Sequence, residues 1–261
     1  MQKQIIVSAG DSLTAKLVEK MGFDGIWVSG FETSARLGLP DNGSITMTEM
    51  LRETEKIVKA VSIPVYVDVD TGYGNYKRTV QEFRDIGAAG ICVEDNILPK
   101  TNSLWGDKQV LKDPQAMADM LSSVKYKDFT VIARTEALIR GFGGHIALER
   151  AKLYAETGVG MVCIHSRDSK GLEALQMALE WKSEVPLCSI PTMFPQVTSD
   201  ELFKAGYSMV VWANQTERMK LKAITQGLKE LKLSGHASSI EDRCISIKEL
   251  KDLSNDNKCS R

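Results

Sequence analysis

Carboxylates at the ends of two apolar segments are the first feature of this sequence that suggests chemistry. Asp68 and Asp70 end the segment IPVYVDVD, and Glu94 ends the segment GAAGICVE. Side chains two residues apart on a strand share a face, so Asp68 and Asp70 are expected to point the same way. Three converging acids form an all-oxygen ligand set that suits Mg²⁺ or Mn²⁺ rather than zinc. The alternative is a set of acids paired with arginines at the rim of the fold.

Other polar residues follow further apolar segments. Arg134 and Glu136 repeat the two-residue spacing in FTVIARTE. Arg134 would point at the acids, where its planar guanidinium suits a carboxylate or phosphoryl oxygen, although such a pair can also be purely structural. His165 ends the segment GVGMVCIH. A lone histidine is often a core residue, but its position corresponds to that of Glu94 and favours a functional role.

The segment SGFETSARLGLPDNGSITM follows an apolar run that contains Trp27 and ends at Ser29. Its glycines, its proline and the cluster Asp-Asn-Gly-Ser predict a long loop. Spacing alone would place Asp41 of this cluster in an Asx turn. Trp27 is interpreted as a core residue or a pocket wall.

A repeat identifies the elements that must position these residues. Four segments of similar pattern begin at Gly22, Gly87, Gly158 and Gly206, and each follows a helical pattern. Such a glycine ends a helix, and a strand follows it. Four further strands are predicted at residues 4–9, 63–70, 129–136 and 186–192. Helix starts are predicted at three positions, namely Asp11, Thr46 and Asp113.

Eight apolar strands alternating with helices predict a (β/α)₈ TIM barrel. An open doubly wound sheet is the alternative, but no GxGxxG motif follows the first strand. We predict one domain over residues 1–261, with residues 236–261 as a C-terminal helical extension. In a barrel the seventh residue after each repeat glycine lies at the catalytic end of an alternate strand. These residues are Ser29, Glu94, His165 and Ala213.

Composition excludes several classes of function. A net charge of −1 over 261 residues leaves no electrostatic footprint for nucleic acid or for a membrane surface. No signal peptide or membrane-spanning run is recognised. Cys92, Cys163 and Cys188 lie in apolar runs and are interpreted as small hydrophobic residues, with no zinc or disulfide pattern. We expect a reduced, cytoplasmic protein.

Several motifs together resemble the isocitrate lyase and phosphoenolpyruvate mutase superfamily, and in particular its phosphoenolpyruvate mutases. They are VSGFETSARLGLPDN, VDVDTGYGN, EDNILPKTNSL, IARTEALIRGFG, CIHS, PT and VVWAN, and the similarity extends to IEDRCISIKEL. The resemblance implies a Mg²⁺-dependent barrel enzyme that acts on a small molecule. It also implies a homo-oligomer, a dimer or a homotetramer, whose last helices swap between neighbours.

The resemblance also assigns roles to individual residues. Asp41 matches an essential aspartate that receives or steers the phosphoryl group, and Arg134 and His165 match a substrate-contacting pair. The residues that match the metal-binding carboxylates are Asp68, Asp70 and Glu94, with Asp68 as a direct ligand. Those that match the segment around the pyruvyl carboxylate are Trp27, Ser29, Gly30 and Phe31. Those that match a gating loop are Lys100, Asn102 and Ser103.

The implied activity is the interconversion of phosphoenolpyruvate and 3-phosphonopyruvate, with residues 97–107 as a lid. Asn96 departs from the mutase signature, which has a lysine there, and the loop ends LWGD rather than LHDG. A phosphonopyruvate hydrolase is the nearest alternative, and Asn102 favours the mutase. A carbon–carbon lyase is disfavoured because KTNSL lacks the cysteine of the lyase loop. A catalytically inactive barrel that serves as a binding module is the remaining alternative.

Overall fold

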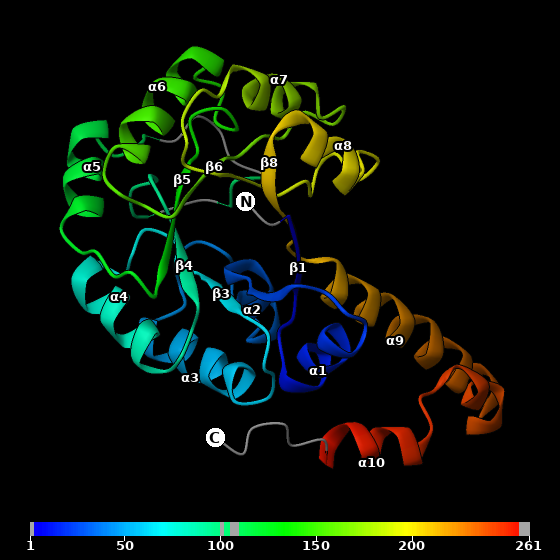
Figure 1. Ribbon diagram of the computed structural model, residues 1–261. Coiled ribbons are helices and arrows are strands. Elements are labelled where there is room, and N and C mark those ends of the chain that lie inside the picture. The colour runs from blue at the N-terminus through cyan, green and yellow to red at the C-terminus, as the bar shows by residue number, and fades with distance from the viewer. Residues whose placement is uncertain (1–2, 100–101, 105–109, 256–261) are drawn as a thin grey trace.

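The computed structural model describes residues 3–99, 102–104 and 110–255. Its centre is a closed barrel of parallel strands in the order β1 to β8, surrounded by helices (Figure 1). The predicted (β/α)₈ barrel is therefore confirmed. The strands are β1 (Gln4–Ser8), β2 (Gly25–Val28), β3 (Val65–Asp68), β4 (Gly90–Glu94), β5 (Thr130–Thr135), β6 (Met161–Ile164), β7 (Leu187–Ser189) and β8 (Tyr207–Trp212).

Several of the helices that follow the strands begin where the sequence provides an N-cap side chain. The side chain of Asp11 accepts a hydrogen bond from Thr14, Thr46 forms a capping box with Glu49, and Asp113 caps a helix that opens with proline. All three predicted starts are confirmed. The helices are α1 (Ser12–Lys20), α2 (Gly30–Arg36), α3 (Met47–Val58), α4 (Tyr76–Asp85), α5 (Pro114–Ser122), α6 (Gly144–Ala155), α7 (Leu172–Glu180), α8 (Ser199–Ala205), α9 (Gln215–Ser234) and α10 (Ile247–Asn255).

Two local predictions were wrong. The segment that follows β2 was predicted as a loop, but the hydroxyl of Ser29 accepts from the backbone N–H of Glu32 and starts helix α2. The strand predicted at 63–70 ends at Asp68, and Asp70 lies beyond it with a φ of 48°. A left-handed residue breaks the alternation of side chains, so Asp68 and Asp70 do not share a strand face.

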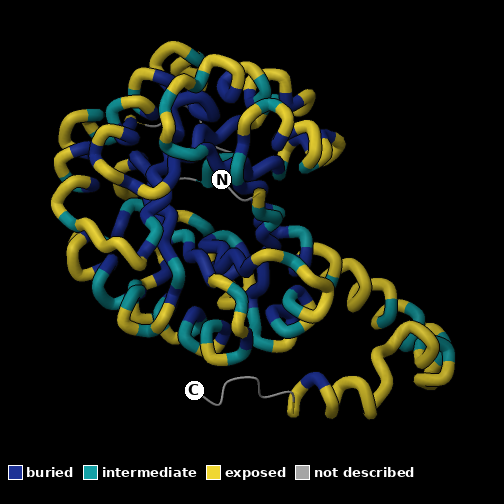
Figure 2. The backbone as a smooth tube through the Cα atoms, viewed as in Figure 1, coloured by how far each residue is buried: buried dark blue, intermediate teal, exposed yellow. Residues whose placement is uncertain are grey.

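The apolar core has two layers, one between the strands and the helices and one inside the barrel. Figure 2 shows the buried strands at the centre and exposed outer faces on the surrounding helices. Cys92, Cys163 and Cys188 are free and buried in the barrel interior, in keeping with their interpretation as small hydrophobic residues. No helix in the described ranges is long and apolar enough to cross a membrane.

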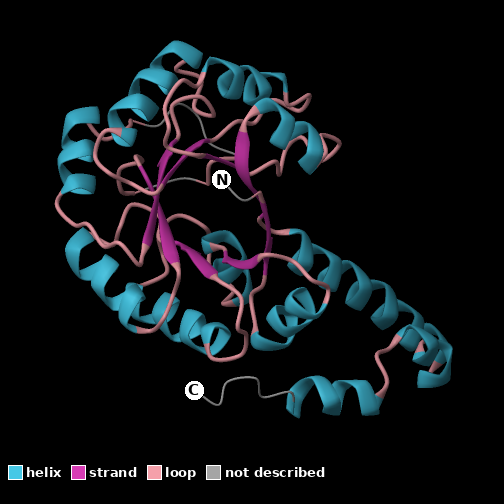
Figure 3. Cartoon of the chain, viewed as in Figure 1, coloured by secondary structure: helices cyan, strands magenta, loops and turns pink. Residues whose placement is uncertain are grey.

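A helical arm follows the barrel. Helix α9 projects outward and leads through two short 3₁₀ helices, Ala237–Ser239 and Glu241–Arg243, to α10 (Figure 3). Helix α10 returns to α1, where the ammonium group of Lys16 donates to the carbonyl of Leu253 at 3.0 Å. A C-terminal helix after the barrel was expected, and the structure has it.

Two glycines that flank Thr130 allow the strands to approach closely. A Cβ on Gly90 would lie 2.3 Å from the carbonyl oxygen of Thr130, whereas a Cβ on Gly160 would lie 3.0 Å from its Cγ2. Backbone cannot yield without breaking the ladder between β4 and β5, but a side chain can rotate.

We predict that Gly90→Ala lowers the free energy of unfolding by about 3 kcal/mol or more. Gly160→Ala, on the other side of the same threonine, is expected to cost about 1 kcal/mol. Urea unfolding followed by circular dichroism measures both. An equal loss of unfolding free energy in the two variants would contradict the explanation that Gly90 faces backbone and Gly160 faces a side chain.

Candidate functional site

A small cavity of about 60 Å³ lies at the C-terminal ends of the strands. This is the end where barrels of this type carry their chemistry. The predicted residues that line it are Trp27, Ser29, Phe31, Asp41, Asp68, Glu94, Asn102, Ser103, Arg134 and His165. Its remaining walls are Leu104, Ile190, Thr192, Ala213 and Asn214. Gly30 and Asp70 are not among the lining residues, and Lys100 lies outside the described residues.

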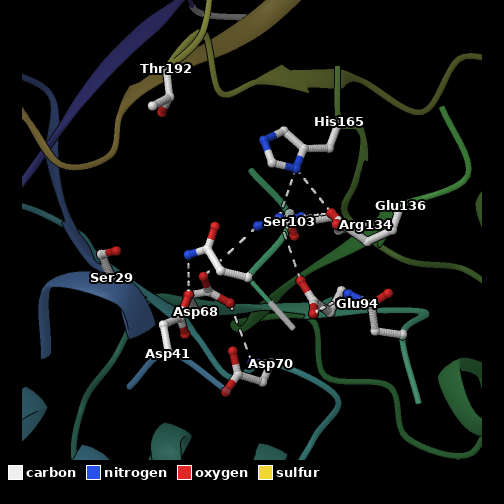
Figure 4. Close-up of polar contacts among 12 residues, drawn as sticks. Ser29, Asp41, Asp68, Asp70, Glu94, Ser103, Arg134, Glu136, His165 and Thr192 are labelled. Carbon is white, nitrogen blue, oxygen red and sulfur yellow. Dashed lines mark hydrogen bonds and ion pairs between the residues drawn. The ribbon is translucent and has the colours of Figure 1, made fainter. Parts of the chain in front are cut away.

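The guanidinium group of Arg134 occupies the centre of the polar wall (Figure 4). Its Nε lies 2.5 Å from Oε1 of Glu136, and its terminal nitrogens lie 3.5 Å from Glu94 and 3.9 Å from Asp68. Its Nη2 also lies 2.7 Å from Nδ1 of His165. Glu94 and Arg134 are register partners on β4 and β5, which brings the two charges together. The guanidinium group of Arg134 therefore pairs with three carboxylates and orients the imidazole of His165.

The shifts in pKa follow from this arrangement. Burial alone would lower the pKa of Arg134, but Glu136, Glu94 and Asp68 outweigh it and hold the pKa well above its ordinary value. Burial would raise the pKa of Glu136, yet Arg134 and His165 hold it well below its ordinary value. Burial lowers the pKa of His165, with Arg134 acting in the same direction. At neutral pH the site thus contains a neutral imidazole beside a permanent guanidinium.

Residues 102–104 of the predicted lid line the cavity. The amide of Asn102 donates a hydrogen bond to the carboxylate of Asp41, and the backbone N–H of Leu104 donates to Oδ1 of Asn102 at 2.9 Å. Ser103 accepts from Nη2 of Arg134 at 3.1 Å. Residues 102–104 therefore connect Asp41 on one wall with Arg134 on the other. The lid residues 100–101 and 105–107 lie outside the described residues.

The three acids that the sequence assigned to a metal do not all line the cavity. Asp68 and Glu94 line the cavity, whereas Asp70 follows the end of β3 and does not. A Cβ on Gly30 would lie 3.3 Å from Oδ1 of Asp70, so Gly30 leaves room for that carboxylate. Within the described ranges, no three histidine, cysteine or acidic side chains are arranged to hold a metal ion. The roles of these acids remain predictions.

The donor chemistry of the cavity nevertheless fits a hard cation. Asp68 and Glu94 present oxygen atoms, and the carboxylates around Arg134 exceed its single positive charge. Mg²⁺ commonly keeps several waters and uses only one or two protein carboxylates, so a complete protein cage is not required. Asp68 is the better-placed direct ligand because it is the more exposed of the two.

Asn96, the departure from the mutase signature, supports Glu94. Its amide donates to Oε1 of Glu94 at 2.7 Å, and both side chains are buried. The neighbouring Asp95 is also buried, and its carboxylate accepts from Thr135, from Tyr154 and from the backbone of Glu136. Asp95 joins the end of β4 to the end of β5 and does not face the cavity. Of these two neighbouring acids, Glu94 is thus a cavity residue and Asp95 is a structural one.

Sequence reasoning did not assign site roles to Thr192 and Asn214. Both line the cavity, and the amide of Asn214 donates to the hydroxyl of Thr192 at 3.2 Å. They lie in the motifs PT and VVWAN, which contributed to the resemblance, so a signal was present. Figure 4 places Thr192 on a different side of the site from Asp41.

The fold and the site are those of a (β/α)₈-barrel enzyme with an acidic, arginine-centred cavity at its catalytic end. The chain belongs to the phosphoenolpyruvate phosphomutase family, whose model matches residues 2–232. This family lies in the superfamily of isocitrate lyase, so the resemblance noted in the sequence is confirmed.

Individual relatives with three different activities resemble this chain. The crystal structure of phosphoenolpyruvate phosphomutase from Streptomyces platensis subsp. rosaceus superimposes with a TM-score of 0.94 at 35% identity, covering 97% of this chain and 91% of that one. Phosphonopyruvate hydrolase in complex with oxalate and Mg²⁺ gives a TM-score of 0.91 at 32% identity, covering 97% and 90%. A 2-methylisocitrate lyase from Aeropyrum pernix is 33% identical over 97% of this chain and 83% of its own length.

A buried carboxylate lies behind the wall formed by Ser29 and Phe31. Oε1 of Glu32 accepts from Ser8 at 2.9 Å, from Thr216 at 3.3 Å and from the backbone N–H of Glu217 at 3.3 Å. Burial raises the pKa of Glu32 to about 7, from an ordinary value of 4.5, despite these hydrogen bonds. The folded protein therefore binds this proton more tightly than the unfolded chain does.

We predict that Glu32 makes the protein lose stability as the pH rises between 4.5 and 7. Because the folded state holds the proton more tightly, its contribution is complete below the lower value and lost above the higher one. The expected loss from pH 5 to pH 8 is about 2–3 kcal/mol relative to Glu32→Gln, which cannot titrate. Urea unfolding of both proteins at the two pH values measures it. A pH-independent difference would contradict the assignment.

Proposed function

We propose that this protein is a phosphoenolpyruvate mutase, which interconverts phosphoenolpyruvate and 3-phosphonopyruvate. The observation that carries the proposal is the contact between Asn102 and Asp41 over a cavity that contains Arg134. In this proposal Asp41 would be the phosphoryl acceptor, Arg134 the cation that stabilises an enolate and Asn102 part of a cover against water, and all three line one small cavity. All three are needed if phosphorus is to leave one atom of a molecule and return to another.

The residues of the chain divide the reaction between them. Arg134 would bind the pyruvyl oxygens and stabilise the charge of the enolate formed when phosphorus leaves the C2 oxygen. Asp41 would receive or steer the phosphoryl group until C3 of the same enolate captures it. His165, held neutral, offers a second polar contact at the same wall. Asn102 and Ser103 would exclude water, which otherwise diverts the reaction to pyruvate and phosphate.

Mg²⁺ is the proposed cofactor. Asp68 and Glu94 would hold it, and waters would complete the coordination. Asp70, which does not line the cavity, would assist through the waters rather than as a direct ligand. When bound, the ion would neutralise negative charge on the substrate oxygens. The excess of acids around Arg134 and the oxygen-only donor set of the cavity support this proposal.

The alternatives differ in the fate of the substrate rather than in the architecture of the site. A phosphonopyruvate hydrolase would pass the phosphoryl group to water, and the Asn102–Asp41 contact argues against such access. A carbon–carbon lyase would need an acid or base in the lid, and residues 100–104 read KTNSL, without the lyase cysteine. An inactive barrel would not need to retain Asp41, Asp68 and Arg134 around one cavity.

Incubation with 3-phosphonopyruvate and Mg²⁺, followed by phosphorus NMR, tests the activity. We expect phosphoenolpyruvate as the product. Inorganic phosphate would instead identify a hydrolase, and pyruvate or glyoxylate released from a hydroxy acid substrate would identify a lyase. EDTA is expected to abolish turnover, because the acids of the site would lose the cation they bind.

Asp41→Ala is the matched variant in the same assay. Turnover is expected to fall at least about a thousandfold, because the phosphoryl acceptor is gone. Binding of oxalate in the presence of Mg²⁺, measured by calorimetry, is expected to change less than about threefold, because Arg134 and the other acids remain. Wild-type turnover in this variant would remove Asp41 from the chemistry.

We also propose that the protein is a homotetramer in which the C-terminal arm packs against a neighbouring copy. Exposed apolar side chains along α9 and α10 support this, since a monomer would leave them in water. They include Met219, Leu221, Ile224, Leu228, Ile247 and Leu250. The swapped C-terminal helix that the resemblance implies would cover these side chains.

Sedimentation velocity is expected to give a tetramer for the wild-type protein. Ile224→Glu combined with Leu228→Glu should shift the population to smaller species, because charge would enter an apolar interface. Lys222→Glu, also on α9, is the matched control for added negative charge. A monomer for the wild-type protein would contradict the proposal.

A further inference from the structure

Helix α9 begins differently from most of its neighbours. Its N-cap residue is Asn214, a residue type strongly preferred there, yet its side chain makes no capping hydrogen bond within the described structure. At seven other helices of the described structure the N-cap side chain accepts from a backbone N–H three residues further on. These N-caps are Asp11, Ser29, Thr46, Asn75, Asp113, Thr198 and Ser246.

The side chain of Asn214 is instead engaged at the cavity. Its Nδ2 donates to the hydroxyl of Thr192, its Oδ1 accepts from Arg218 at 3.3 Å, and the residue is only 5% exposed. An amide nitrogen has two hydrogens, so a second hydrogen can serve a ligand. Asn214 and Thr192 together present N–H and O–H groups to the cavity that they line.

Glu32 replaces the missing cap from another helix. Its Oε1 accepts from the backbone N–H of Glu217, the third residue of α9, which is an amide that N-cap side chains ordinarily satisfy. It also accepts from the hydroxyl of Thr216 in the same turn. Glu32 is 1% exposed, and acidic oxygens are favourable at a helix N-terminus.

Glu32 does not line the cavity, but it follows directly on a residue that does. It lies in the first turn of α2, directly after Phe31, and its own backbone N–H is capped by Ser29 at 3.4 Å. Ser8 at the end of β1 anchors the same carboxylate oxygen. One side chain therefore connects the segment Ser29–Phe31 with the start of α9.

We propose that Glu32 is a positioning residue that caps α9 from α2 and so frees the Asn214 amide to bind an anionic oxygen of the substrate. The proposal rests on the proposed function only for the identity of that substrate, a small phosphorylated or phosphonylated carboxylic acid. Asn214 is then a substrate-binding residue, with Thr192 as its partner.

The argument depends on competition for one side chain. If the oxygen of Glu32 is removed, the amide of Glu217 loses its partner, and Asn214, as the N-cap residue of α9, has the position and side chain that ordinarily supply one. An Asn side chain that turns back to cap its own helix leaves the cavity, because it cannot occupy both places. Loss of Glu32 should therefore weaken substrate binding although every cavity residue is still present.

Crystal structures and kinetics of Glu32→Ala, Asn214→Ala and the double variant test the proposal. In Glu32→Ala, the side chain of Asn214 is expected to accept from Thr216 or Glu217 and to leave the cavity. Each single variant should raise KM for phosphonopyruvate about tenfold or more with little change in kcat, as for a lost hydrogen bond to a charged group. The double variant should be no worse than Asn214→Ala, because both changes remove the same contact.

Three further variants separate positioning from stability. Glu32→Gln keeps an accepting oxygen and is expected to restore a low KM. Glu32→Asp is too short to reach the amide of Glu217 and should displace Asn214 in a folded protein even if the alanine variant does not fold. Glu201→Ala removes a cap from α8 at the surface, and it should lower the melting temperature while leaving KM unchanged.

The position of Asn214 in the crystal does not depend on the substrate, so this readout stands even if the proposed function fails. An Asn214 side chain that stays in the cavity in both Glu32→Ala and Glu32→Asp would overturn the proposal. A multiplicative increase of KM in the double variant would also overturn it.

Discussion

The site depends on the burial of one guanidinium among several acids. Removing any charge from water is costly, and the cost is recovered only where partners of opposite charge and good geometry are fixed. Arg134 meets Glu136, Glu94 and Asp68 because β3, β4 and β5 are register neighbours whose ends coincide. Acids in excess over one cation leave the cavity negative, and this is the condition that favours the binding of a divalent cation.

The barrel brings residues that are far apart in the sequence into contact. Asp41 and Asn102 are separated by 61 positions in sequence, yet they meet above the cavity because the loops after β2 and β4 leave the same end of the barrel. The strand ends fix Arg134 and Glu94 rigidly, whereas the covering residues lie on loops. A rigid base with a separate cover would suit the proposed reaction, which must exclude water.

Much of this arrangement could be predicted from sequence. The alternation of apolar strands with helices and the repeat glycines predicted the barrel. The position seven residues after each glycine predicted that Ser29, Glu94 and His165 lie at one end of it. The features that the sequence analysis missed share a cause, because none of them changes the pattern of apolar and polar residues along a strand. The left-handed backbone at Asp70 and the early start of α2 are local features, and the cap from Glu32 to α9 joins residues far apart in the chain.

The difference between a mutase and a hydrolase on this fold is a matter of which nucleophile reaches phosphorus. A mutase must keep the enolate and the phosphoryl group together while excluding water from a space of about 60 Å³. The hydrogen bond from Asn102 occupies an oxygen of Asp41 that would otherwise be available to orient a water molecule. In the proposed mutase, this contact would limit the access of water to the phosphoryl group, and rearrangement would then be favoured over hydrolysis.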